Sequence, residues 1–294
     1  MEDRIIAYGG QAVIEGVLMR GKKAMAIAMR APNGEIVTHQ EALSGLYRSS
    51  ITKIPFLRGL ILLWDALGLG MRALTISANT QTGQDEKLEG PALYLTLGLS
   101  LTIGVGLFFL LPAGVGHLAE SLLGWNVWWN NLLEGIVRLL LLVGYIWGIG
   151  FIPEIKRVFA YHGAEHKTIN AYEAGADLTP ESVAQYPLEH ARCGTAFLLT
   201  LVLLSILVFM ALGPLPVFWR LASRLLLLPV LAGIAVEYIR WTANHLDSRL
   251  IRWMIKPNLA LQSLTTREPD LAMLEVAIRA FETMRQAEET QIRV

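Results

Sequence analysis

PALYLTLGLSLTIGVGLFFLL, at residues 91–111, is a run of 21 residues without a charged side chain. At the ~1.5 Å rise of an α-helix, this length reaches about 31 Å, which matches the hydrocarbon thickness of a bilayer. Three further apolar runs follow, at residues 132–152, 196–212 and 221–241. Together the four runs predict a mainly α-helical, polytopic membrane bundle over residues 91–241.

The composition of the whole chain agrees with a membrane protein. Its 294 residues are 53% hydrophobic and 17% charged, whereas soluble domains carry about 25% charged residues. Intrinsic disorder is excluded, because it needs low hydrophobicity and high charge. Lys+Arg and Asp+Glu both number 25, so no excess of positive charge indicates a nucleic-acid partner. We therefore expect the lipid bilayer, and not nucleic acid, as the main partner.

Positively charged residues predict the orientation of the four helices. Residues 1–53 hold seven Lys and Arg, the loop 153–195 holds four, and the tail from Arg240 holds eight. The connections 112–131 and 213–219 hold none. By the positive-inside rule, both termini and the 153–195 loop lie in the cytoplasm.

A fifth apolar segment, residues 54–76, predicts an amphipathic helix that does not span the membrane. It contains Arg58, Asp65 and Arg72, and such charges are costly at the centre of a bilayer. Their spacing of seven places them on one stripe of the helix. We expect this helix to lie at the interface, or to be re-entrant and packed inside the bundle.

Residues 1–53 predict a small β unit on the cytoplasmic side. The segments 24–30 and 35–40 flank Pro32-Asn33-Gly34, and Asn-Gly between alternating runs is a hairpin signal. Upstream, the carboxylate of Glu15 either faces a ligand or belongs to a solvated strand.

Residues 242–294 predict a cytoplasmic helical tail, and residues 77–90 a flexible connector. Pro269 and Asp270 are N-terminal helix signals for a stripe in the tail. We expect that stripe to pack on the β unit; its apolar residues recur at helical spacing and are Leu271, Leu274, Ile278 and Phe281.

The segment YHGAEHK, residues 161–167, is the main candidate for chemistry. On a helix, His162 and His166 are i and i+4 on one face, and two such imidazoles can bind one metal ion. Glu165 completes H-x-x-E-H, the inverted zincin pattern in which the glutamate is the general base. The pattern predicts a site for a divalent metal such as zinc. The alternative is a pair of interfacial histidines that hydrogen-bond to their neighbours.

Three residues compete as the third ligand. His190 and Cys193 precede the third predicted helix, and Glu237 closes the fourth, so the predicted topology brings all three to one depth. An inverted zincin uses a downstream glutamate as its third metal ligand, which favours Glu237. Proximity to the membrane surface favours His190 or Cys193 instead.

Charged residues also occur within the apolar runs. Glu134 and Arg138 are i and i+4, a spacing that allows mutual neutralisation near the outer interface or a part in an ion path. Arg220 and Arg224 are expected to extend outward to water.

Four motifs together resemble the YqhQ-like family of bacterial membrane proteins, which carries the domain of unknown function 1385. They are GGQAVIEGVLMRG (9–21), YHGAEHK (161–167), RCGT (192–195) and LTTREPD (264–270). The resemblance extends over nearly the whole chain, and departures at Leu18 and Ala191 leave the polar positions intact. It implies a bacterial plasma membrane and a predicted metal-dependent enzyme.

These features support three hypotheses of function. The first is a metal-dependent hydrolase at the cytoplasmic membrane interface, acting on a peptide or lipid-like substrate, with Glu165 activating water. The second is a non-enzymatic scaffold or assembly factor that binds a cytoplasmic protein. The third is a channel or transporter built on Glu134, Arg138 and Glu237, which with four spans would need to form a homo-oligomer.

Overall fold

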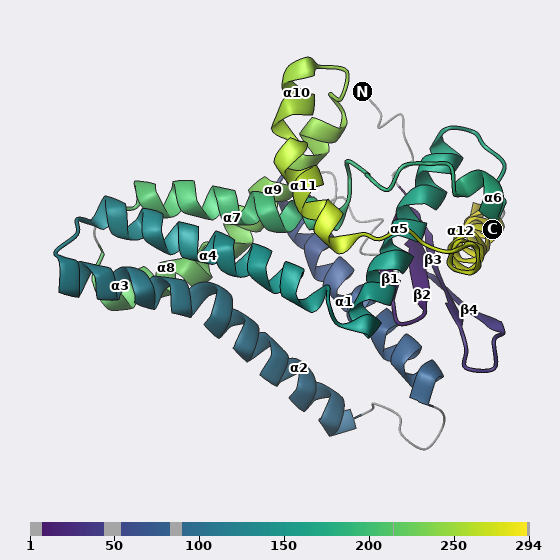
Figure 1. Ribbon diagram of the computed structural model, residues 1–294, viewed down its shortest axis with the longest axis horizontal. Coiled ribbons are helices and arrows are strands. Elements are labelled where there is room, and N and C mark those ends of the chain that lie inside the picture. Colours follow the sequence, from purple (N-terminus) through teal and green to yellow (C-terminus); the bar gives the residue numbers. More distant parts are fainter. Residues whose placement is uncertain (1–7, 44–53, 83–89, 214, 293–294) are drawn as a thin grey trace. The chain divides into compact units, whose positions relative to one another are not determined.

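The computed structural model describes residues 8–43, 54–82, 90–213 and 215–292, which are mainly helical with one small antiparallel sheet (Figure 1). The chain divides into two compact units. Unit 1 takes in Met1–Leu88, Gly150–Cys193 and Gln262–Val294, and unit 2 takes in Glu89–Ile149 and Gly194–Leu261. The expected fold class, a mainly helical chain with an N-terminal β unit, is confirmed.

Unit 1 is built on a four-stranded antiparallel sheet of order β1-β2-β3-β4. The expected hairpin is present, because Arg30 pairs with Ile36 across the turn and Gly34 adopts φ +86°, which favours glycine. The glycine-rich motif at 9–21 forms the first hairpin. The strands are β1 (Gly9–Val13), β2 (Gly16–Arg20), β3 (Ala24–Arg30) and β4 (Ile36–Ala42).

Helices cover both faces of this sheet. On one face, α5 (Pro153–Glu173) and α12 (Leu271–Ile292) enclose the larger apolar core together with inward-facing sheet residues. Leu274 and Phe281 of α12 are fully buried there, so the tail packs on the β unit as predicted. The short helix α6 (Pro180–Val183) also contacts α12.

The other face of the sheet is covered by α1 (Leu57–Thr82), through Ala73 and its neighbours. This helix continues through residues 77–82, where a connector was expected, because Ser77 is buried and accepts a hydrogen bond from the Ile14 backbone N–H. The rest of that connector, residues 83–89, lies outside the described residues, as do residues 1–7 and 44–53 of the β unit. Trp64, in the first half of α1, is 80% exposed.

Unit 2 contains four helices that are long and apolar enough to cross a membrane, counted over the described residues. The first, Leu93–Leu123, comprises α2 (Gly90–Val105), the π-helical turn η3 (Gly106–Leu110) and α3 (Leu111–Leu123). The others are α4 (Val127–Ile149), α7 (Gly194–Ala211) and the pair α8 (Val217–Leu226) and α9 (Leu228–Ala243). The remaining helices are α10 (Arg249–Met254) and α11 (Lys256–Thr265).

The connection predicted at residues 112–131 is largely helical, which corrects the sequence-based expectation. Pro112 follows the π-helical turn η3 within one continuous helix, and the Phe108 carbonyl, which the proline cannot pair, accepts from Arg138 Nε at 2.9 Å. The helix therefore continues until Gly124, which adopts φ +64° and ends it.

A buried ion cluster lies among the apolar helices of unit 2. Glu134 accepts hydrogen bonds from Arg138 Nη2 at 2.7 Å, from Arg224 Nε at 2.9 Å and from Arg224 Nη2 at 2.7 Å. All three residues are at most 2% exposed. The outward orientation expected for Arg224 is therefore wrong, because Glu134 and Asn131 offer acceptors in the interior.

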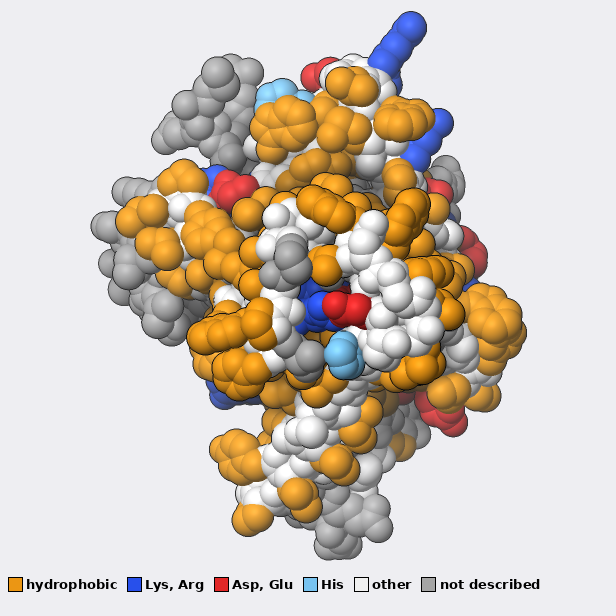
Figure 2. All heavy atoms as spheres, turned by 90° about the vertical axis from the view of Figure 1, so that its left-hand side faces the viewer, with side chains coloured by type: hydrophobic (Ala, Val, Ile, Leu, Met, Phe, Trp, Pro, Cys, Tyr) orange, Lys and Arg blue, Asp and Glu red, His pale blue; other side chains and the backbone are white. Residues whose placement is uncertain are grey.

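Arg220, four residues before Arg224, is also buried, so the outward orientation expected for it is wrong as well. It pairs with the partly exposed Glu120 at 2.6 Å. In Figure 2, apolar side chains surround a small group of basic, acidic and histidine side chains at the centre of the view.

Candidate metal-binding site

Helix α5 carries the predicted histidines and glutamate. It begins with Pro153 and Glu154, and both residue types are favoured in a first turn. The helix is unbroken through Gly163, so His162 and His166 do lie one turn apart, with ring centroids 4.4 Å from each other. A side chain at Gly163 would collide with the Arg267 carbonyl and with Leu188. The glycine thus lets α5 approach the segments that hold the two histidines.

Gly163→Ala is expected to destabilise the fold by about 1–3 kcal/mol, because the new methyl group meets a backbone carbonyl that cannot move aside freely. The matched control is Gly68→Ala in α1, where a methyl group meets no atom within 4 Å. Alanine there should stabilise the helix by about 0.5–1 kcal/mol. Thermal unfolding of both variants in detergent micelles measures the difference. Equal effects at the two glycines would contradict the packing argument.

Backbone carbonyls fix the orientation of both imidazoles. Nδ1 of His162 lies 2.9 Å from the Thr265 carbonyl oxygen, and Nδ1 of His166 lies 2.6 Å from that of Leu188. A carbonyl only accepts hydrogen bonds, so each Nδ1 carries the proton and each Nε2 keeps its lone pair. Metal-binding histidines are typically oriented in this way by a carbonyl or carboxylate.

The two imidazoles and the thiol of Cys193 lie close together. His162 Nε2 lies 3.1 Å from Cys193 Sγ, and one ligand atom from each of His162, His166 and Cys193 lies within 4.8 Å of the others. Nε2 of His166 is buried and has no hydrogen-bond partner among the described residues. An unpaired buried acceptor costs about 1–3 kcal/mol. Two imidazoles and a thiolate are ligands that zinc prefers, so this donor set fits such an ion.

Glu165 lies at the side of α5 that contacts β1. A Cβ atom at Gly10 would come within 2.9 Å of its Cδ, so the glycine leaves room for the carboxyl. Glu165 is 5% exposed, and its Oε2 has no hydrogen-bond partner in the described part of the chain. Burial raises the pKa of Glu165 to about 7, while the nearby His162 and a backbone hydrogen bond from Gly10 act in the opposite direction.

His190 lies beside this group and is not part of it. Its ring centroid is 5.6 Å from that of His166, and its Nε2 lies 3.3 Å from Nη2 of Arg192. Burial, together with the charge of Arg192, lowers the pKa of His190 to about 3, so the ring is neutral and accepts from Arg192. The side-chain amide of Gln262 holds the His190 backbone N–H and carbonyl at 2.9 and 3.0 Å.

Of the three residues left open as third ligand, the structure brings Cys193 together with the two histidines. Glu237 lies in α9, in unit 2. The ligand roles of His190 and Glu237 stay predictions.

Comparison with known proteins gives the family. The model of a family of proteins of unknown function, DUF1385, matches residues 54–287. The chain belongs to this family. The uncharacterized protein YqhQ of Bacillus subtilis (strain 168) is 35% identical over 290 residues, which cover 94% of this chain and 91% of that protein. No solved structure matches the chain. Membership in DUF1385 confirms the resemblance seen in the four motifs and assigns no activity.

Glu15, in the first of those motifs, ties the β1–β2 hairpin to α5. It occupies the turn with φ +53°, and its carboxylate accepts from Arg157 Nε and Nη2 at 2.5 and 2.6 Å. The hydroxyl of Tyr161 donates to it at 3.3 Å. The hydrogen bond from Arg157 lowers the pKa of Glu15, and Glu15 in turn raises the pKa of Arg157. Glu15 is therefore an ion-pair partner rather than a solvated strand residue.

Glu15→Gln is expected to lower the free energy of unfolding by about 1 kcal/mol at pH 7, since the pair is only partly buried. The pKa of Glu15 is depressed from 4.5 in the folded chain. The pair therefore stabilises the fold fully above about pH 4.5, and its contribution is lost as the pH falls through the depressed pKa of Glu15. The free energy of unfolding, measured at pH 7, 5 and 3, should differ less between wild type and variant as the pH falls. Glu289→Gln, which breaks the more exposed pair with Arg285, is the control with a smaller effect. A difference that persists unchanged at pH 3 would contradict the ion-pair argument.

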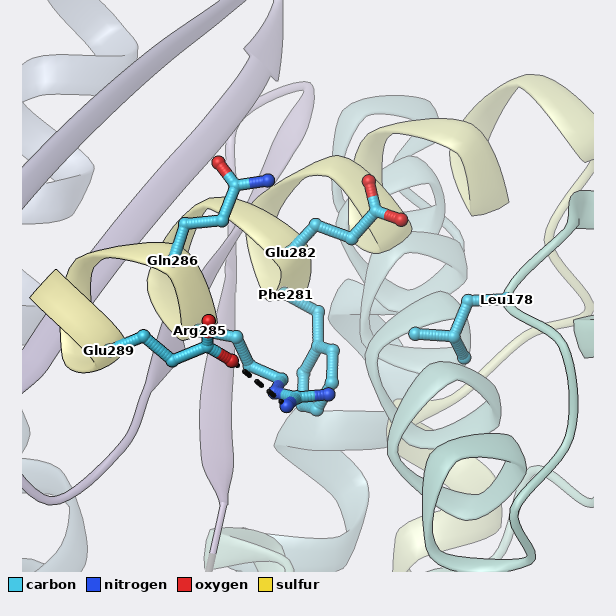
Figure 3. A pocket seen from close by; sticks show the side chains of 6 residues that line it. All are labelled: Leu178, Phe281, Glu282, Arg285, Gln286 and Glu289. Atoms are coloured by element: carbon cyan, nitrogen blue, oxygen red, sulfur yellow. Dashed lines mark hydrogen bonds and ion pairs between the residues drawn. The ribbon is translucent and has the colours of Figure 1, made fainter.

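A separate pocket of about 260 Å³ in unit 1 is lined by residues of α12 and by Leu178 (Figure 3). Arg285 reaches into it, pairs with Glu289 and lies 4.9 Å from the centre of the Tyr172 ring. No residue of the candidate metal site lines this pocket. Arg285 and Glu289 are thus paired with each other within unit 1.

Several partners of the site were not found from the sequence. The carbonyls of Leu188 and Thr265, the amide of Gln262 and the backbone of Gly10 all come from segments distant from α5. The motifs at residues 9–21 and 264–270 were the only features of the sequence that indicated these segments.

Proposed function

We propose that this chain is a metal-dependent hydrolase of the bacterial plasma membrane, with its site at the cytoplasmic interface. The observation that carries the proposal is the group of His162, His166 and Cys193, in which carbonyls bind Nδ1 of both imidazoles and Nε2 of His162 lies 3.1 Å from the thiol. These three residues would hold a divalent ion such as zinc. When bound, such an ion supplies Lewis acidity for hydrolysis.

Glu165 is the general base of the proposed reaction. Its Oε2 lacks a hydrogen-bond partner among the described residues, and the carboxyl lies near enough to His162 for that ring to lower the pKa of Glu165. The carboxylate removes a proton from water as the water oxygen bonds to the substrate carbonyl carbon. The same proton then passes from Glu165 to the leaving group as the scissile bond breaks. Gly10 holds the carboxyl in place through its backbone.

Chain connectivity supports a location at the membrane surface. α5 begins at Pro153, shortly after the candidate span α4 ends at Ile149. Cys193 directly precedes Gly194, the first residue of the candidate span α7. The site segment is therefore attached to membrane-length helices at both ends. The basic residues of the termini and of this segment support the cytoplasmic side and a topology with both termini inside.

The ion cluster of unit 2 gives little support to the channel hypothesis. Both carboxylate oxygens of Glu134 accept from guanidinium groups, and Arg138 also donates to Ser205. Such mutual pairing favours a structural role that joins α4, α7 and α8. Among the described residues, no specific contact favours the scaffold hypothesis over the hydrolase.

Metal analysis of the purified full-length chain tests the proposal. We expect about one zinc-like ion per chain in detergent micelles, held by three protein ligands with one position left open for water or substrate. Hydrolysis of a fluorogenic amide or ester should disappear with a chelator and return with zinc. A folded chain that takes up no metal from a zinc buffer would refute the proposal.

A further inference from the structure

We propose that the candidate site takes an extended peptide, held by main-chain hydrogen bonds along the free edge of β1. This inference rests on the proposed hydrolase function and names its substrate class. The edge strand and the carboxyl of Glu165 lie together in unit 1, and both belong to the motifs that the sequence singled out.

β1 is an edge strand. It pairs with β2 on one side, and no described strand pairs with its other side. An open strand edge presents main-chain donors and acceptors that can pair with a further extended chain.

The register shows which groups of β1 face that open edge. The two-residue turn closes on the pair Val13–Gly16, and hydrogen-bonded and non-hydrogen-bonded pairs alternate along an antiparallel ladder. Gly10 and Ala12 therefore direct their N–H and C=O groups away from β2. The hydrogen bond from the Gly10 backbone to Glu165 agrees with this assignment.

The open stretch of the edge is short and lies next to the proposed base. Beyond it, the Ile14 N–H donates to Ser77 of α1 at 3.3 Å, which closes that end. The N–H and C=O of Ala12 have no hydrogen-bond partner in the part of the chain that the structure describes. Gly10 is exposed, and a Cβ built at Gly9 meets no atom within 4 Å. A strand that pairs with the remaining free groups of Gly10 and Ala12 would run past Glu165, whose carboxyl already accepts from the Gly10 N–H.

The chemistry of this edge selects a peptide over a lipid ester. The C=O groups of Gly10 and Ala12 need N–H donors, and the N–H of Ala12 needs an acceptor, at the repeat of a strand. A peptide offers both groups in alternation, whereas an acyl ester offers acceptors only. Hydrolysis of the bound amide adds water across the C–N bond, giving a carboxylic acid and an amine. The amine nitrogen receives the proton that Glu165 took from water.

Cleavage of defined peptides tests the inference. The full-length chain, zinc-loaded in detergent micelles, is incubated with tryptic peptides of casein, and the products are identified by mass spectrometry. A cleaved peptide is then remade with one N-methyl group at each position in turn. We expect cleavage to fall about three- to tenfold at alternate positions, as for the loss of one hydrogen bond. Losses without alternation would overturn the pairing with β1.

Variants of Ala12 test the protein side of the same contact. Ala12→Pro removes an N–H that the ladder to β2 does not use, and edge strands tolerate proline at such positions. We expect a similar three- to tenfold loss of peptide cleavage with unchanged metal content, and no loss in Ala12→Ser, which keeps the N–H. If Ala12→Pro does not fold, the N-methyl series on the unchanged chain decides.

The same assays separate the two proposals. A zinc-loaded chain that hydrolyses phosphatidylglycerol vesicles and leaves the peptides intact would overturn the peptide assignment while the hydrolase stands. A chain that binds no zinc would refute the hydrolase itself.

Discussion

The variant His166→Ala is expected to lose its bound metal and, with it, all metal-dependent hydrolysis. In the wild type, Nε2 of His166 is buried and has no hydrogen-bond partner among the described residues. The substitution removes this proposed ligand, and alanine offers no atom to replace it. Loss of an outer-shell partner typically lowers metal affinity 10–100-fold, and loss of a ligand should exceed about 100-fold. Zinc titration with a competing chelator measures the change.

Two further variants sharpen this result. Cys193→Ser should weaken zinc binding as His166→Ala does, because Sγ belongs to the same group of ligand atoms. His190→Ala is the matched control, since its ring is only 5.6 Å from that of His166 but lies outside the group. A loss of zinc in His190→Ala and none in Cys193→Ser would assign the third ligand to His190 instead.

Glu165→Gln separates metal binding from proton transfer. Glutamine keeps the shape of the side chain and cannot accept the proton, so zinc should remain bound while hydrolysis falls about 10²–10⁴-fold. A variant that keeps full hydrolysis would remove Glu165 from the mechanism.

The second large effect is expected from Glu134→Gln in unit 2. Within the described residues, Glu134 is the carboxylate that pairs with both Arg138 and Arg224, and all three are nearly inaccessible. Glutamine leaves two buried guanidinium groups without an opposite charge. Breaking a buried pair in this way destabilises a fold by about 3–5 kcal/mol. Thermal unfolding in detergent micelles, followed by circular dichroism, measures the loss.

Glu120→Gln is the control for the ion cluster. It makes the same chemical change to the Arg220 pair, but the side chain of Glu120 is 34% exposed. Only the Arg220 guanidinium is left without an opposite charge, and water reaches the Glu120 side of the pair, so the expected loss is smaller, about 1–3 kcal/mol. Similar losses in the two variants would show that burial does not govern the contribution of Glu134.

Local properties of the chain predicted a large part of the architecture. The four membrane-length helices follow from runs of apolar side chains, because suitability for lipid is set residue by residue. The β3–β4 hairpin follows from Asn33-Gly34, since few residues other than glycine accept φ +86°. The i, i+4 spacing of His162 and His166 placed both rings on one helical face before any tertiary contact was known.

Other features depend on segments far apart in the sequence. The helix runs past Pro112, and the Phe108 carbonyl that the proline cannot pair accepts from Arg138, 30 residues away. Arg224 turns inward because Glu134, 90 residues away, accepts from it.

The chain's composition and periodicity alone therefore specify membrane-length helices, a small sheet and a helix bearing two histidines, because each of these depends on side chains a few residues apart. Only folding brings Cys193 to the two histidines, sets the tautomers of both rings and places Glu165 against Gly10. These arrangements require the carbonyls of Leu188 and Thr265 and the edge of β1 to meet α5 in space, and no local pattern encodes contacts between segments so distant in the chain.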